Sequence, residues 1–332
     1  MKQTIKKVGI TYDLKQDYIN AGFSKEEAAE FDEIGTIDAI DNELIAMGFE
    51  TERIGNVKML IAQLQQGERW DMVFNICEGV SGIGREAQVP AVLDVYNIPY
   101  VFSDVLVLAL TLHKGLTKRV VRDAGVPTPD FYLVETETDI AQVNLPYPLF
   151  AKPVAEGTGK GISANSRIKN AEQLKLVCTQ LLKEFKQPVL VETFLPGREF
   201  TVGIVGNGAD CKAVGTMEIL FKKKDETNEV YSYNSKSNYH ELMDYTVPEK
   251  EVALACEQTA LNAWKALGCV DGGRVDIRMD SNGIPNFIEV NPLAGLNPID
   301  SDLPILGYKN GWTYSKLMNE IVNSAIKRIQ HK

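Results

Sequence analysis

The sequence is poor in the residues that build disulfide frameworks and metal centres of the cysteine or histidine type. Only five of its 332 residues are cysteine and three are histidine. The cysteines are odd in number and widely spaced, and no two form a Cys-x-x-Cys pair. This pattern argues against a disulfide framework, a structural zinc site, a histidine metal cluster and a serine-histidine triad. We expect reduced cysteines that are buried in the core.

Long apolar runs are also lacking. The longest, Val105 to Leu110, is far too short to span a bilayer, and the opening MKQTIKKVGITYD turns polar without the apolar region of a secretion signal. The net charge of -10 argues against general binding to nucleic acid or to anionic membranes. We expect a cytoplasmic protein with neither as a partner, in which local lysines and arginines meet any phosphate ligand.

The composition that remains is ordinary for a globular protein, with 44% hydrophobic and 24% charged residues. A chain of 332 residues exceeds what one hydrophobic core usually serves, so we expect two or three packed units around a shared cleft. Small-molecule sites favour such clefts. We place an N-terminal α/β unit at 1–103, a central unit at 104–188 and a C-terminal unit with the metal and substrate site at 189–332.

The first hundred residues alternate short apolar strands with amphipathic helices, which predicts a small parallel sheet covered by helices. We expect strands at Lys7 to Tyr12, Met72 to Ile76 and Tyr100 to Phe102, and helices at about Thr36 to Met47 and Ala87 to Tyr96. The segment Asp13 to Asp32 is longer and more acidic than a typical strand-to-helix loop. It is either a substrate-side excursion or plain surface.

The rest of the chain passes from α/β to α+β. A helix from about Lys114 ends at Gly125 before Val-Pro-Thr-Pro, and Asn170 with Gln173 predicts a capping box for a later helix. That helix would bury Leu174, Val177 and Leu181. Strands are expected at Val189 to Thr193, Glu199 to Val205, Ala213 to Phe221, Gly273 to Met279 and Ile284 to Val290, with helices at Lys250 to Leu267 and at the C-terminus.

The most informative segment is Gly273 to Asn291, where two alternating strands flank Asn282-Gly283, a strong signal for a type I′ hairpin. With these two residues at the centre of the turn, Asp276 lies opposite Glu289. Arg274 then lies opposite Asn291, and all four side chains share one face because side chains alternate along a strand. Val275, Ile277, Ile288 and Val290 would face the core.

Two carboxylates directly across a strand pair repel each other, so their placement asks for a counter-charge. Oxygen donors from Asp276, Glu289 and Asn291 suit Mg²⁺, which commonly uses one or two protein carboxylates together with water and phosphate. The alternative is a solvent-facing hairpin in which Arg274 and Arg278 neutralise the acids.

Two further segments carry weaker signals. AKPVAEGTGKG, from Ala151 to Gly161, places a lysine before a glycine-rich loop of the kind that approaches phosphate, although it matches neither a Walker A motif nor a dinucleotide fingerprint. Its alternative is a flexible hairpin tip. In the segment Val189 to Gly206, Glu192 and Glu199 can accept hydrogen bonds from a nucleotide amino group or ribose, or can simply be solvated.

Together the three segments resemble the ATP-grasp superfamily, and specifically the D-alanine-D-alanine ligase family, from about Val101 to the C-terminus, with a looser match before it. The resemblance implies an ATP-grasp fold behind an N-terminal parallel-sheet domain. It also implies a ligase that joins small amino acids through an acyl phosphate, with ATP and Mg²⁺ or Mn²⁺, as a homodimer.

The resemblance assigns roles to individual residues. The ATP-binding residues it implies are Lys114, Lys152, Glu156, Thr158, Glu192, Phe194, Leu195, Glu199 and Lys236. Arg274, Lys236 and Gly295 would be catalytic, and Asp276, Glu289 and Asn291 would be the metal ligands. Gly295 and Ser301 would contact substrate, and Lys222 to Tyr239 would be the loop that closes over the nucleotide.

The sequence departs from the family pattern where the family binds its substrates. The N-terminal signature is replaced by NICEGVSGIGREAQVP at Asn75 to Pro90, and the early turn with a substrate-orienting glutamate is replaced by Asp13 to Asp32. Ser237 follows Lys236 where an aromatic residue or histidine is usual. We therefore expect ATP chemistry with a substrate other than D-alanine, unless the two replaced segments supply equivalent contacts.

Two other functions stay open at this stage. One is an ATP-grasp ligase for a different amino acid, peptide or hydroxy acid, which would share every nucleotide-binding residue. The other is a catalytically silent nucleotide-binding regulator. The joint presence of Lys152, Arg274, Asp276 and Glu289 disfavours a silent protein.

Overall fold

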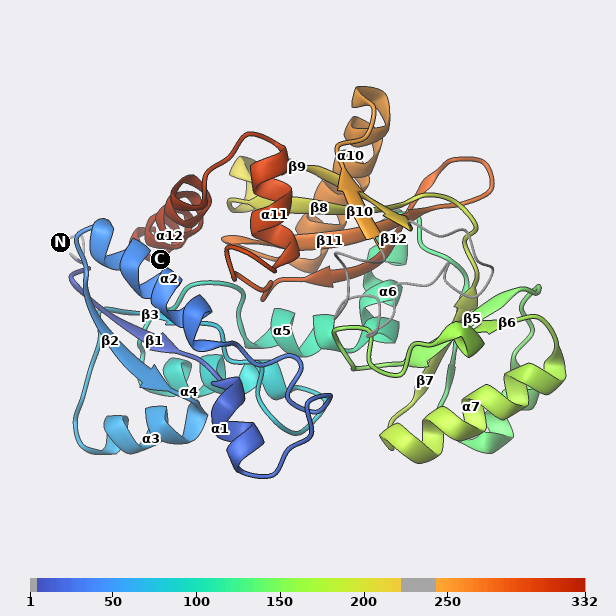
Figure 1. The fold of residues 1–332 in the computed structure, drawn as a ribbon, viewed down its shortest axis with the longest axis horizontal. Coiled ribbons are helices and arrows are strands. Elements are labelled where there is room, and N and C mark those ends of the chain that lie inside the picture. The colour runs from blue at the N-terminus through green and yellow to red at the C-terminus, as the bar shows by residue number, and fades with distance from the viewer. Residues whose placement is uncertain (1–4, 222–242, 332) are drawn as a thin grey trace.

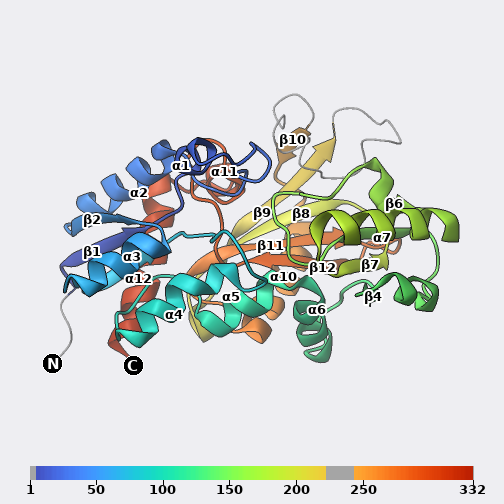
Figure 2. The same ribbon diagram turned by 90° about the horizontal axis from the view of Figure 1, so that it is seen from below.

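The computed structural model describes residues 5–221 and 243–331, which form three sheets with helices packed around them (Figures 1 and 2). The strand orders are β2-β1-β3, β4-β7-β5-β6 and β10-β9-β8-β11-β12. Short 3-10 turns lie at Arg85–Ala87 (η1), Glu137–Gln142 (η2), Ala164–Ser166 (η3) and Gly208–Asp210 (η4).

The first sheet is parallel, as predicted. It comprises β1 (Lys7–Thr11), β2 (Glu50–Gly55) and β3 (Met72–Asn75), with α1 (Lys15–Asn20), α2 (Ile34–Ala46), α3 (Val57–Gln65) and α4 (Gln88–Val95) around it. Strand β2 was not predicted, because it is an edge strand whose first four residues are not buried, so no apolar run marks it. The expected strand at Tyr100 to Phe102 is wrong, because only a single bridge joins Tyr100 to Val73.

The second sheet follows two linking helices, α5 (Val105–Leu112) and α6 (Lys114–Asp123). Its strands are β4 (Phe131–Val134), β5 (Leu149–Pro153), β6 (Arg167–Ile168) and β7 (Val189–Thr193), and α7 (Ala171–Phe185) covers one face (Figure 1). The helix α7 buries its predicted apolar residues, but its capping differs from a reciprocal box. Asn170 accepts from the N–H of Gln173, whereas the Gln173 side chain accepts from the N–H of Lys169.

The third sheet is antiparallel and holds the longest strands. They are β8 (Glu199–Val205), β9 (Lys212–Phe221), β10 (Met243–Thr246), β11 (Gly272–Met279) and β12 (Pro285–Asn291), with α10 (Lys250–Leu267), α11 (Asp302–Lys309) and α12 (Tyr314–Gln330). The fully buried Trp264 of α10 packs with Phe200 and Val275 in one core. The unit boundaries at 103 and 188 stay predictions; β7, which begins at Val189, pairs with strands that precede that boundary.

The two ends of the chain share a hydrophobic core. Met318 and Ile321 of α12 are fully buried in the same cluster as Val8 and Ile10 of β1. Each fully buried side chain of this size contributes roughly 1.5 to 3 kcal/mol relative to exposure. The N-terminal sheet is therefore held against the C-terminal unit, and this contact sets the walls of the cleft between them.

The hairpin β11–β12 reaches the predicted register through a different turn. Arg274 pairs with Asn291 and Asp276 with Glu289, as expected, but a bulge follows and the turn is a three-residue loop closed by Asp280 N–H to the Ile284 carbonyl. The loop is one residue longer than predicted, and the bulge leaves one residue of β12 without a partner. The two changes cancel, so Asp276 and Arg274 keep their predicted partners. One side-chain direction changes in consequence, because Phe287 takes the buried place expected for Ile288.

All five cysteines are free and buried, as predicted. Among residues 5–221 and 243–331 no helix is long and apolar enough to cross a membrane.

Candidate active site

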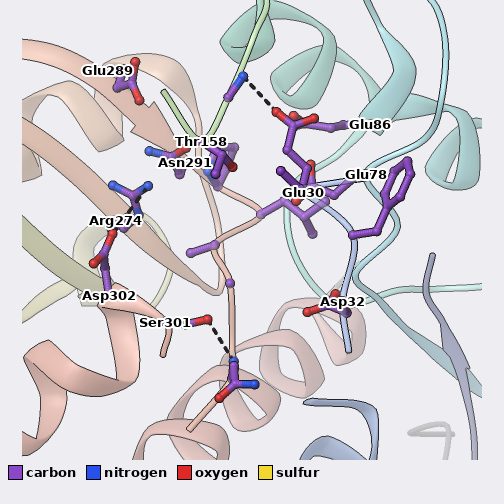
Figure 3. A pocket seen from close by; sticks show the side chains of 18 of the residues that line it. Glu30, Asp32, Glu78, Glu86, Thr158, Arg274, Glu289, Asn291, Ser301 and Asp302 are labelled. Atoms are coloured by element: carbon purple, nitrogen blue, oxygen red, sulfur yellow. Dashed lines mark hydrogen bonds and ion pairs between the residues drawn. The ribbon is translucent and has the colours of Figure 1, made fainter. Parts of the chain in front are cut away.

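A cavity of about 660 Å³ lies between the loops of the N-terminal sheet and the hairpin β11–β12. Figure 3 shows Arg274, Asn291 and Ser301 on one side of this cavity. Carboxylates of Glu30 and Glu86 lie on the opposite side. The cavity therefore has one wall of mixed charge, where Glu289 and Asp302 accompany Arg274, and one wall dominated by acids.

Lys114, Lys152 and Glu192, predicted to bind nucleotide, form an unbroken chain of alternating charge with the predicted metal ligand Glu289. Glu289 Oε2 lies 3.7 Å from Lys114 Nζ and 3.6 Å from Lys152 Nζ, and Lys152 Nζ lies 3.6 Å from Glu192 Oε1. The chain ends at Lys118, whose Nζ lies 2.9 Å from Glu192 Oε2. Buried charges of this kind are tolerated only when they are paired, and here every carboxylate lies between two cations.

Helix α6 supplies both ends of this charge chain. His113 caps the helix by accepting the N–H of Leu116, and Lys114 is the first helical residue. Lys114 and Lys118 stand one turn apart and so point the same way. Lys118 was not singled out in the sequence, and its spacing of four residues from Lys114 is the signal that could have found it.

A smaller pocket of about 90 Å³ adjoins the chain and collects the residues predicted to hold the base and ribose. Its apolar lining includes Phe150, Phe194 and Leu195, and Glu192 and Glu199 supply carboxylates. Burial raises the pKa of Glu199, and Arg278, 3.0 Å away, opposes that rise. An apolar slot with few polar groups is the usual form of a site for a planar ligand.

The three predicted metal ligands meet on one face of the hairpin. Asp276 Oδ1 accepts from Thr201 Oγ1 at 2.8 Å and from Arg274 Nη1, and the amide of Asn291 lies 3.3 Å from Asp276 Oδ2. Glu289 faces the two lysines of the charge chain. The alternative predicted from the sequence had Arg274 and Arg278 neutralising the two hairpin acids. It is wrong for Arg278, which pairs with Glu199.

The donor set fits a magnesium ion. Across residues 5–221 and 243–331, no cluster of three or more acidic, histidine or cysteine residues could hold a metal alone. Two carboxylates and one amide oxygen match Mg²⁺, which takes its other ligands from water and phosphate. Such an ion would neutralise Asp276 and Glu289. In this structure Arg274 pairs with the first, and Lys114 and Lys152 pair with the second.

The glycine-rich loop after β5, which the sequence predicts to approach phosphate, turns through left-handed residues. Thr158, Gly159 and Gly161 all have positive φ, at 52°, 72° and 72°. The N–H groups of Lys160 and Ile162 donate to the carbonyls of Gly157 and Gly159, so the loop is held by its own turns. Lys114 Nζ donates to the carbonyl of Glu156, so the loop also touches the charge chain.

An acidic residue of the N-terminal unit holds this loop. Glu30 accepts from the N–H of Gly157 at 2.8 Å, from Arg85 Nη2 at 3.0 Å and from Lys160 Nζ at 3.2 Å. Burial works against ionisation of Glu30, but Arg85 and Lys160 outweigh it and its pKa lies below the ordinary value. Glu30 belongs to the Asp13 to Asp32 segment, which is thus no plain surface.

The remaining carboxylates of the acidic wall have raised pKa values. Burial raises the pKa of Asp32 and of Glu86 to about 7, and burial followed by the nearby Glu86 raises that of Glu78 well above its ordinary value. Asp32 and Glu86 come from the two segments that replace family motifs. Arg85 opposes the rise at Glu78 and Glu86, and an ammonium group bound in the cavity would further favour their ionised forms.

The predicted substrate contacts lie at the far end of the cavity. Ser301 Oγ accepts the N–H of Asn297 at 3.0 Å, and a Cβ on Gly295 would lie 2.7 Å from that same oxygen. Gly295 is therefore required for the close approach of its loop to Ser301. Lys236, Ser237 and the expected closing loop lie outside the described residues.

Comparisons with known proteins show the family and the fold of the chain. The family model described as D-ala D-ala ligase C-terminus matches residues 120–323. The chain is 31% identical to the D-alanine–D-alanine ligase of Bordetella avium over 247 residues, which are 73% of this chain and 74% of that protein.

Solved structures share the whole fold. The VanG D-Ala:D-Ser ligase from Enterococcus faecalis superposes with a TM-score of 0.74 at 19% identity, covering 97% of this chain and all of the other. The D-alanine–D-alanine ligase from Bacillus anthracis complexed with ATP gives 0.73 at 21% identity, covering 99% of each chain. The predicted ATP-grasp fold with an N-terminal parallel sheet is thereby confirmed.

The family model covers more than half of the chain, and the curated relative is matched over about three quarters of its length. The chain accordingly belongs to the D-alanine–D-alanine ligase family of ATP-grasp proteins and is an ATP-dependent ligase of that type.

Proposed function

We propose that this ligase joins two small amino-bearing carboxylic acids through an acyl phosphate. The observation that carries the proposal is the single cavity in which Lys114 and Arg274 face the carboxylates of Glu30, Asp32 and Glu86. Cations on one wall suit a carboxylate and a transferring phosphoryl group, and acids on the other suit an ammonium group. The two kinds of charge of an amino acid therefore find partners on opposite walls.

The nucleotide would lie along the charge chain. Its base would enter the slot lined by Phe194 and Leu195, with Glu192 and Glu199 toward the base and ribose. Lys114 and Lys152 would meet the phosphates beside the glycine-rich loop Glu156 to Gly161, and we assign Lys236 to the same task from the resemblance. ATP is supplied in the cytoplasm, which is where we place the reaction.

The chemistry follows from these positions. One oxygen of the substrate carboxylate attacks the γ-phosphorus, the bond to the β-γ bridging oxygen breaks, and ADP leaves. The amine of the second substrate then attacks the acyl carbon and expels inorganic phosphate, and it loses a proton as the amide forms. Arg274 steadies the transferred phosphoryl group, and the N–H of Gly295 is assigned to the tetrahedral oxyanion.

Asp276, Glu289 and Asn291 would hold Mg²⁺, or Mn²⁺ in its place, and the ion would neutralise charge on the phosphates. Ser301 would grip the carboxylate of the second substrate. Its oxygen accepts from Asn297, and the hydroxyl hydrogen has no acceptor among the residues that the structure describes, so it can be donated to a ligand.

The substrates proposed for this chain differ from D-alanine. Asp32, Glu78 and Glu86 line the cavity in addition to Glu30, so the single ammonium group of a simple amino acid would pair with only part of these acids. A second amino group on the substrate would pair with more of them. We therefore place amino acids or short peptides with an additional positive charge ahead of D-alanine, which the relatives named above use according to their names.

Phosphate release from ATP, measured with a panel of amino acids, tests both the ligase reaction and the choice of substrate. We expect release to need an amino acid and to be faster with a diamino acid such as D-ornithine than with D-alanine. Release that no carboxylate and amine pair stimulates would refute the ligase assignment. Saturation with D-alanine at submillimolar concentration and a turnover of about 10 per second would refute the substrate assignment alone.

We also propose that the protein works as a homodimer. Val95 of α4 and Leu106 of α5 are 77% and 74% exposed, and Val80 and Ile83 in the preceding loop are also exposed. Apolar side chains gathered on adjoining elements are typical of subunit interfaces. Light scattering after size exclusion should show a dimer for the native chain and a monomer for Leu106→Glu. A native monomer at micromolar concentration would contradict the proposal.

A further inference from the structure

Lys118 is the most deeply buried lysine of the charge chain. Its side chain is wholly inaccessible, and its ammonium group donates to Thr128 Oγ1 at 2.9 Å and to the Phe287 carbonyl at 3.4 Å, besides its ion pair with Glu192 at 2.9 Å. Two hydrogens of the ammonium group are thus donated to neutral oxygens, and its charge is balanced by the carboxylate of Glu192. Burial lowers the pKa of Lys118 to about 8, and Glu192 opposes that fall.

Lys118 acts on the base pocket only through Glu192. The pocket of about 90 Å³ is lined by Glu192, Lys152 and Phe194, whereas Lys118 is absent from its lining. Burial disfavours the ionised form of Glu192, but Lys118 and Lys152 outweigh it, and the pKa of Glu192 lies below the ordinary value. Without Lys118 the carboxylate would keep only Lys152, at 3.6 Å, as a charged partner.

An ionised carboxylate can accept hydrogen bonds but cannot donate them. A purine with a 6-amino group offers a donor at the edge where Glu192 lies, and a purine with a 6-carbonyl offers an acceptor. The first would be bound and the second repelled. A protonated or neutral side chain at the same place would discriminate less, because it could donate to the carbonyl.

We propose that Lys118 is a positioning residue that selects the nucleotide base, by holding Glu192 as a fixed carboxylate at the edge of the base pocket. The inference rests on the proposed nucleotide site and adds the residue that sets its selectivity. Fold stability alone does not require the pair, because a buried ion pair can often be replaced by neutral residues of similar size without loss of stability.

The test uses the full chain with two variants and a matched control. Lys118→Met leaves Glu192 without its nearest cation, and Lys118→Met with Glu192→Gln removes both charges and keeps the shape. Arg119→Met removes an exposed cation from the same helix as the control. Thermal unfolding checks that each variant folds. Calorimetric titration with ATP and with GTP, each with Mg²⁺, gives the selectivity directly.

We expect the native chain and Arg119→Met to prefer ATP strongly. Lys118→Met should lose about 10-fold to 100-fold of that preference, which is the scale of one hydrogen bond to a charged group, and the double variant should show the loss when the carboxylate itself is gone. A folded Lys118→Met with native ATP-to-GTP selectivity, beside a double variant that has lost it, would overturn the role of Lys118 and leave the proposed function standing. A native chain that binds neither nucleotide would refute the proposed function itself.

Discussion

Replacing Glu30 by glutamine would test how the N-terminal unit holds the phosphate loop. The carboxylate of Glu30 bonds to the Gly157 N–H, Arg85 and Lys160, and none of the three charged side chains is more than 10% exposed. Glutamine keeps the length of the side chain and an oxygen that can accept from Gly157. It removes the negative charge of this side chain, so the variant isolates the electrostatic part of the contact.

The magnitude follows from what is left behind. Removing one partner of a buried ion pair costs about 3 to 5 kcal/mol, because the other charge stays buried. Lys160 keeps Glu156 at 3.9 Å, and the oxygen of glutamine still accepts from Gly157, so we expect the lower end, about 3 kcal/mol. At roughly 2 to 4 °C per kcal/mol, the unfolding midpoint should fall by about 5 °C or more.

The pH dependence has a definite sign. The pKa of Glu30 is lowered in the folded protein, so its contribution is complete above the ordinary glutamate pKa of about 4.3 and is lost as the pH falls through the lowered value. The difference between Glu30→Gln and the native chain should therefore be full at pH 7 and should shrink in acid.

Thermal unfolding and ATP kinetics of the two proteins provide the assay. The KM for ATP should rise, because the loop loses the group that anchors Gly157. Glu27→Gln is the control, since Glu27 lies in the same segment, is exposed and accepts only from Ser24. An unfolding midpoint and a KM for ATP that match the native values at pH 7 would refute the reasoning.

Three further outcomes are expected. Asp276→Asn should abolish magnesium-dependent turnover while circular dichroism stays native, since the hairpin loses repulsion toward Glu289 as well as a ligand; retained activity with unchanged magnesium dependence would contradict it. Glu86→Gln should stabilise the substrate-free protein by about 1 to 3 kcal/mol at pH 8, because burial raises the Glu86 pKa to about 7 and ionisation above that pH costs stability. That gain should vanish near pH 4, and a gain independent of pH would count against it. Gly157→Ala should raise the KM for ATP, because a Cβ there would lie 2.4 Å from the Glu30 carboxylate, and an unchanged KM would show that the loop can yield.

The sequence by itself determined the elements whose signals are local. The helix over Lys250 to Leu267 appears with the predicted bounds, and the pairing of Asp276 with Glu289 was predicted correctly. The pairing came out right although the turn did not, because a bulge at Ile288 compensates for the extra loop residue. Side-chain alternation and strand pairing are short-range properties, so residues within a single hairpin carry them.

Only the tertiary structure decided which charges meet. Glu30 reaches Gly157 across 127 positions of sequence, and the pairing of Lys118 with Glu192 depends on how α6 packs against β4, the strand that pairs with β7. In the sequence, Glu30 stands among other acids of an acidic segment, and Lys118 looks like any lysine of a polar helix. Burial separates these residues from their neighbours, since a charge removed from water must find a partner, and that partner comes from whichever element the fold brings alongside.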